Sequence, residues 1–138
     1  MNLIHLHPML VHFPVALTLV ALCFHLADYW FKQEWLNKGA VALVVLATLG
    51  AFASLCSGFF FTKPVAGLAA SIKEVHIMFA SISTVFLVLA SIVGLISLWK
   101  KNGIPWKYFF TVLLILASIA ISLAGMKGGS IVYDVWLF

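Results

Sequence analysis

Four long apolar stretches constrain the fold of this chain more than any other feature of its sequence. They cover about residues 9–31, 40–61, 75–99 and 106–126, and each meets the requirement of roughly 20 apolar residues for a helix that crosses a hydrocarbon core. Hydrophobic residues make up 64% of the 138 residues and charged residues 9%, whereas soluble globular domains carry about 25% charged residues. The sequence therefore predicts an all-α integral membrane protein.

The connections between the four stretches are short, so the spans use nearly the whole chain. Short connections join antiparallel neighbours in helical bundles. We expect a single domain over residues 1–138, folded as a four-helix antiparallel bundle in contact with membrane lipid. The first stretch is too long for a cleaved signal peptide, so we expect it to remain in the mature protein.

The lysines predict the orientation of the bundle. The net charge is +4, and all the basic residues other than histidine are lysines. Five of them lie in or beside the connections 32–39 and 100–107, and three lie at the opposite ends of the spans. Because positive charge is enriched on the cytoplasmic side, we expect a bacterial inner membrane protein with both termini outside. The scattered lysines form no basic patch, so no nucleic-acid partner is expected.

The sequence HPMLVHFP at residues 7–14 places two histidines and two prolines at the start of the first span. The first proline suits an initial helical turn, whereas Pro14 should kink the helix near His12 and free a backbone carbonyl. Ionisable side chains in membrane spans normally face the bundle interior and mark function, so we expect His12 to point inward. His25 lies near the other end of the span beside Asp28, and we expect it to make only a local hydrogen bond.

Small residues follow the histidines of the first and third spans. At alternating spacings of four and three, His76 is followed by Ala80, Ser83, Leu87, Ala90 and Gly94, and His12 by Ala16, Leu19 and Cys23. Both spans begin on the same side of an antiparallel bundle, so His12 and His76 are expected to approach each other across its interior. Ala80 and Ser83 would leave room there for a flat ligand. Ordinary close packing of membrane helices produces the same pattern. The second span carries small residues along one side, where we expect it to pack against its neighbours: Ala47, Gly50, Ser54, Ser57 and Gly58.

With these residues the chain resembles the bacterial four-helix membrane proteins catalogued as domain of unknown function 2231. The matching residues are His7, Pro8, Val11, His12, Phe13 and Pro14 in the opening motif, His76 in the third span, and Gly128, Gly129, Val132 and Tyr133 after the fourth. Lys127 departs from the family pattern, which usually has a histidine at that position. The resemblance implies a membrane fold and no established activity.

A haem b held by two histidines is the leading functional hypothesis. This ligation needs two imidazoles at similar depth on facing helices, and His12 and His76 are the expected ligands. Lys127 is expected to pair with haem propionates directed outward. No nucleophile or general base accompanies the histidines, so we expect an electron carrier or an oxidoreductase subunit rather than a self-contained enzyme. Its partner would be a redox protein or a quinone.

Two alternatives use the same part of the chain. Copper or zinc is one, because imidazoles bind both metals and thioethers favour Cu(I). Its candidate ligands are His5, His7, His12 and His76, with Met9, Met78 or Met126. In the other alternative, the chain is a structural or anchor subunit of a homo-oligomer or a larger complex. Its histidines would then bond only to backbone groups freed by the prolines.

Overall fold

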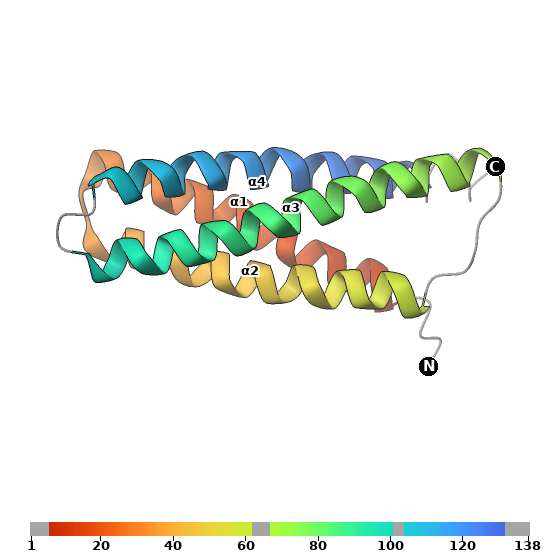
Figure 1. Ribbon diagram of the computed structural model, residues 1–138, viewed down its shortest axis with the longest axis horizontal. Coiled ribbons are helices and arrows are strands. Elements are labelled where there is room, and N and C mark those ends of the chain that lie inside the picture. The colour runs from red at the N-terminus through yellow and green to blue at the C-terminus, as the bar shows by residue number, and fades with distance from the viewer. Residues whose placement is uncertain (1–5, 62–66, 101–103, 132–138) are drawn as a thin grey trace.

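The computed structural model describes residues 6–61, 67–100 and 104–131, which form four helices. Their bounds are α1 Leu6–Phe31, α2 Glu34–Phe61, α3 Leu68–Trp99 and α4 Ile104–Ser130. All four are long and apolar enough to cross a membrane, and they pack against one another along their lengths (Figure 1). The predicted four-helix membrane bundle is therefore confirmed.

The helices pack as two hairpins. Contacts within the α1–α2 and α3–α4 pairs are more extensive than those between α2 and α3 or between α1 and α4. The starts of α1 and α3 and the ends of α2 and α4 lie at one end of the bundle (Figure 1). We call this the His7 end, and we call the opposite end the His25 end.

The apolar core occupies the half of the bundle nearer the His25 end. Its large buried side chains include Val41, Val44, Leu87, Phe110 and Leu114. In the last two turns at the His7 end, the buried positions of the described residues are all small: Ser54, Ser57, Ala69 and Ala124. The interior therefore changes from large apolar side chains to small and hydroxylated ones along the bundle axis.

The inward face of α1 differs from the predicted one. The expected inward stripe is exposed at all four positions, His12, Ala16, Leu19 and Cys23. The buried face instead carries Pro14, Thr18, Ala21, His25 and Asp28. The physical reason is a close approach in which the Pro14 ring and Phe13 pack against Gly50 of α2, where a Cβ atom would lie 3.1–3.3 Å from them. His12 is two residues from Pro14 and so points about 200° away around the helix.

The predicted inward faces of α2 and α3 are largely confirmed. Ser54 and Ser57 of α2 are buried, and so are Ser83, Leu87 and Gly94 of α3. The helix that contains the predicted third span begins at Leu68, before residue 75, where the span was expected to start. Gly67, with φ of 66°, supplies the left-handed turn before it. Residues 68–72, which precede the predicted span, thus belong to the first turns of α3.

Replacing Gly94 with alanine should destabilise the bundle. A Cβ atom at this position would lie 3.0 Å from Phe110 Cε2 and 3.1 Å from Val41 Cγ2, and overpacking a tight contact costs about 1–3 kcal/mol. Gly125→Ala is the matched control, because a Cβ atom there meets nothing within 4 Å. Thermal unfolding of both variants in detergent should show a lower midpoint for Gly94→Ala alone. Equal midpoints would contradict the packing described here.

Candidate functional site

His7 and His76 face each other at the His7 end of the bundle. His7 lies in the first turn of α1, and His76 lies in the third turn of α3. Their ring centroids are 6.4 Å apart and their planes are nearly perpendicular, at 88°. The two imidazoles come from different hairpins, so the contact joins the α1–α2 pair to the α3–α4 pair.

The hydrogen bonds of His7 fix which of its ring nitrogens carries the proton. Ser57 Oγ donates its single hydrogen to the Ser54 carbonyl at 2.9 Å. The 2.8 Å contact between His7 Nδ1 and Ser57 Oγ therefore needs Nδ1–H as the donor. In the neutral ring Nε2 is then unprotonated and carries a lone pair.

His76 is held in the same tautomer by the other hairpin. Its Nδ1 lies 2.7 Å from the backbone oxygen of Ala124 on α4. A carbonyl oxygen can only accept a hydrogen bond, so His76 Nδ1 carries the proton and its Nε2 keeps the lone pair. Both rings of the pair therefore present an unprotonated Nε2, which is the form of imidazole that binds a metal.

A glycine allows each ring to lie close to the other helix of its hairpin. A Cβ atom on Gly58 would lie 3.0 Å from His7 Cε1, and one on Gly128 would lie 3.1 Å from His76 Cε1 and Nδ1. In the α1–α2 hairpin, the hydrogen bonds from His7 lead through Ser57 to the Ser54 carbonyl, and in the α3–α4 hairpin His76 bonds directly to the Ala124 carbonyl. Each carbonyl belongs to the residue four positions before the glycine of the same hairpin, Gly58 or Gly128. The two histidines thus occupy equivalent positions in the two hairpins.

The expected pairing of His12 with His76 is wrong, because His12 is exposed on the outer face of α1. His7 takes its place opposite His76. Sequence spacing contains a signal for this, since His7 and Pro14 are two helical turns apart and share a face, whereas His12 does not. The expectation for His12 rested instead on its deeper position in the span.

The other candidate residues are dispersed. Ser83 is buried and Ala80 is half-buried on α3, where the Ser83 hydroxyl donates to the Ala80 carbonyl at 2.9 Å. Lys127 is exposed in the last turn of α4, next to Gly128. The three candidate methionines face outward, with exposures of 72% for Met9, 49% for Met78 and 69% for Met126. His5, Lys63, Tyr133 and Asp134 lie outside the described residues.

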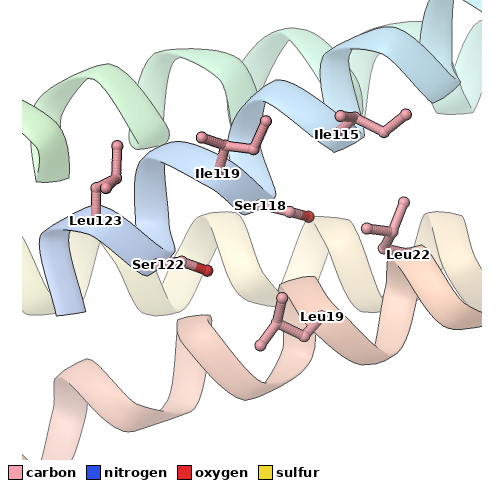
Figure 2. A pocket seen from close by; sticks show the side chains of 7 residues that line it. All are labelled: Leu19, Leu22, Ile115, Ser118, Ile119, Ser122 and Leu123. Carbon is pink, nitrogen blue, oxygen red and sulfur yellow. The ribbon is translucent and has the colours of Figure 1, made fainter. Parts of the chain in front are cut away.

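Two shallow apolar grooves lie away from the histidine pair, along the seams between the hairpins. One, of about 330 Å³, runs between α1 and α4 (Figure 2), and its lining is Leu19, Leu22, Ile115, Ser118, Ile119, Ser122 and Leu123. The other, of about 340 Å³, runs between α2 and α3. Neither contains an ionisable side chain among its lining residues. Within residues 6–61, 67–100 and 104–131, no three His, Cys, Asp or Glu side chains converge as a metal site.

Comparison with known proteins agrees with the fold. A family described as "Predicted membrane protein (DUF2231)" matches residues 3–137, nearly the whole chain. No curated protein and no solved structure matches. The chain belongs to this family of predicted membrane proteins, the domain of unknown function 2231.

Proposed function

We propose that this protein is a membrane electron carrier, or the electron-transfer subunit of an oxidoreductase, that holds haem b between His7 and His76. The observation that carries the proposal is the shared tautomer of the two rings. Ser57 and the Ala124 carbonyl take up both Nδ1 protons, so two Nε2 lone pairs remain on facing helices. Metal-bound histidines characteristically donate their other ring N–H in this way.

The separation of the rings supports this assignment. Metal–imidazole bonds are about 2.0 Å long, so two imidazoles on opposite sides of one metal ion have ring centres roughly 6 Å apart. The observed 6.4 Å is close to that value. The nearly perpendicular ring planes are compatible with it, because each ring can rotate about its own metal–nitrogen bond.

The surroundings of the pair fit a planar group that brings four ligands of its own. Haem needs only two axial side chains from the protein, whereas a structural zinc site needs four ligands and a catalytic one needs three. Two histidines converge in the described residues, and the nearby buried positions are serines and alanines. Bound haem would supply reversible one-electron chemistry.

Each residue around the pair has a distinct role in this proposal. His7 and His76 would hold the haem iron, and Ser57 and the Ala124 carbonyl would keep the two rings in the required tautomer. Ala80 and Ser83 leave space on α3. Lys127, exposed at the same end, would pair with the haem propionates. A redox protein or a quinone on this side would exchange the electron.

We further propose that the protein lies in a bacterial inner membrane with the His7 end outside. The support is the excess of lysines near the connections at the His25 end, which favours the cytoplasm for that end. Reporters that are active only in the cytoplasm, fused to each terminus in turn, should be inactive. An active reporter at either terminus would reverse the orientation.

A reduced-minus-oxidised spectrum of the protein, purified after expression with adequate haem, tests the cofactor. The wild type should show a low-spin haem b spectrum, because two neutral imidazoles would complete the iron coordination. His7→Ala and His76→Ala should each abolish that spectrum, since each removes one axial ligand. His12→Ala is the matched control and should keep it, because the His12 ring is exposed on the outer face of α1.

Circular dichroism of the same samples would verify that each variant retains its helices. Absence of a Soret band from the wild type would overturn the haem assignment. Elemental analysis of that sample would then decide between copper or zinc and a structural role without any metal. A full spectrum in His7→Ala would reject His7 as the ligand while leaving haem binding intact.

The glycines should tune this site without contributing ligands. Gly58→Ala and Gly128→Ala would push the His7 and His76 rings from their seats, because a Cβ atom would lie about 3 Å from each ring. Misplacing a ligand's supporting contacts typically lowers affinity by roughly 10- to 100-fold, and we expect a loss of haem affinity in that range. Gly129→Ala, where a Cβ atom meets nothing within 4 Å, should bind haem like the wild type. Equal haem affinities for all three variants would show that the close packing of the rings against Gly58 and Gly128 does not affect haem binding.

A further inference from the structure

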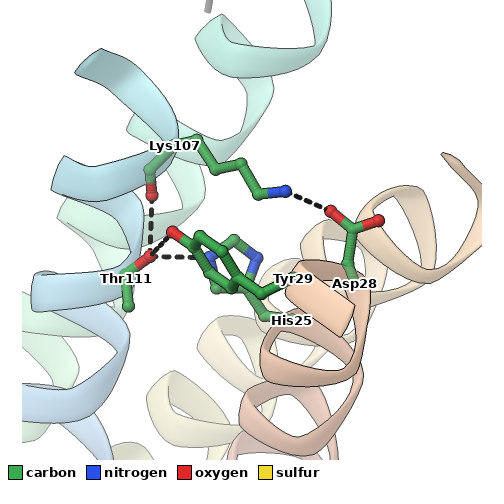
Figure 3. A network of polar contacts seen from close by, with 5 residues as sticks. All are labelled: His25, Asp28, Tyr29, Lys107 and Thr111. Carbon is green, nitrogen blue, oxygen red and sulfur yellow. Dashed lines mark hydrogen bonds and ion pairs between the residues drawn. The ribbon is translucent and has the colours of Figure 1, made fainter. Parts of the chain in front are cut away.

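A second polar cluster lies at the His25 end of the bundle, between α1 and α4 (Figure 3). His25 is fully buried, and its ring meets Phe110 edge to face at 4.7 Å between centroids. Asp28 forms an ion pair with Lys107. Thr111 of α4 joins the cluster through its hydroxyl.

The Thr111 hydroxyl determines the tautomer of His25. Its oxygen lies 2.8 Å from each of three atoms, the Lys107 carbonyl oxygen, His25 Nε2 and Tyr29 Oη. The carbonyl can only accept, so the single Thr111 hydrogen points to Lys107. His25 Nε2–H and the Tyr29 hydroxyl must therefore both donate to Thr111.

This arrangement leaves one lone pair of His25 unsatisfied. With Nε2 protonated, Nδ1 of the neutral ring is an acceptor, and it has no hydrogen-bond partner. The amide oxygen Oδ1 of Asn37 on α2 is likewise buried without a partner in the described part of the chain. The Asn37 side chain is close enough to the His25 ring to interact with it. Both atoms are acceptors without a partner, so a single proton shared between the two side chains would satisfy both.

We propose that His25 and Asn37 form a proton-binding site at the His25 end of the bundle. A proton from water forms a new N–H bond at His25 Nδ1, and this N–H donates to Asn37 Oδ1. The water or hydronium that supplied the proton loses one O–H bond, and nothing is oxidised or reduced. When the proton leaves, the Asn37 amide turns over and its nitrogen donates to Nδ1.

Asparagine suits this position because its side chain both donates and accepts. It satisfies His25 in either protonation state and leaves no buried lone pair exposed to an apolar surrounding. An aspartate there would only accept, and a lysine would only donate. The side-chain chemistry of Asn37 therefore permits reversible proton binding without loss of packing.

Two charged side chains and one tyrosine lie beside His25 in the described part of the chain. Asp28 of α1 and Lys107 of α4 form an ion pair, and Tyr29 of α1 shares the Thr111 hydroxyl with His25. The Lys107 amine lies 4.5 Å above the Tyr29 ring and its side chain is 32% exposed. Lys107 is thus the more exposed member of the ion pair.

Nuclear magnetic resonance of protein with ¹⁵N-labelled histidine, without added haem and in lipid bilayers, tests this proposal. His25→Gln identifies the His25 signals by their loss. In spectra recorded from about pH 4 to 9, Nε2 of His25 should stay protonated, while Nδ1 should be protonated at the acid end of the range and bare at the alkaline end. An Nδ1 that remains in one state over the whole range would overturn the proposal.

Two substitutions of Asn37 should shift the pH at which His25 Nδ1 loses its proton in opposite directions. Asn37→Asp should bind the proton roughly tenfold or more tightly, because a carboxylate favours the imidazolium. Asn37→Leu should weaken proton binding, because it removes the acceptor. Gln33→Asp is the matched control, since it adds the same charge at an exposed position of the same end.

An equal change in the proton affinity of His25 in Asn37→Asp and Gln33→Asp would show that any added negative charge at this end has the same effect. That result would overturn the role of Asn37. If an Asn37 variant fails to fold, the wild-type titration alone decides. The result is independent of the haem assignment, because the measurement uses protein without haem.

Discussion

A polar group inside a bilayer has no water to bond to, and this constraint decides which face of each helix turns inward. In hydrocarbon, each unsatisfied donor or acceptor costs several kcal/mol. The hydroxyls of Thr18, Thr48 and Ser118 therefore donate to carbonyls one turn earlier in their own helices. Histidine has no such local solution, so His7, His25 and His76 each bond to a neighbouring helix. These three bonds link helices at both ends of the bundle.

The glycines make these bonds possible by allowing close approach. His7 reaches α2 over Gly58, and His76 reaches α4 over Gly128, because neither position carries a Cβ atom. Each ring is consequently held by the other helix of its own hairpin. Contacts between the hairpins are less extensive than those within them. The relative position of His7 and His76 therefore depends on how the two hairpins pack together.

Sequence was sufficient for the spans and for the inward faces of α2 and α3, because lipid excludes charge and small residues mark close contacts. It was insufficient for α1. Small residues occur on two of its faces, so composition could not distinguish the stripe through Ala16 from the one through Ala21. The deciding contact, Pro14 against Gly50, joins different helices and has no signature in α1 alone. The hydrogen bond between His7 Nδ1 and Ser57 likewise joins two helices, so the sequence of α1 alone does not predict it.

The two buried histidine sites differ because a single hydroxyl or carbonyl sets the tautomer at each. At the His7 end, Ser57 and the Ala124 oxygen accept from Nδ1, so both Nε2 lone pairs remain for a ligand. At the His25 end, Thr111 accepts from Nε2, and the lone pair lies on Nδ1 beside Asn37. His7 and His25 lie on the same helix, about 27 Å apart if α1 is straight. One residue type thus presents two unprotonated Nε2 atoms at one end of the bundle and a single unprotonated Nδ1 at the other.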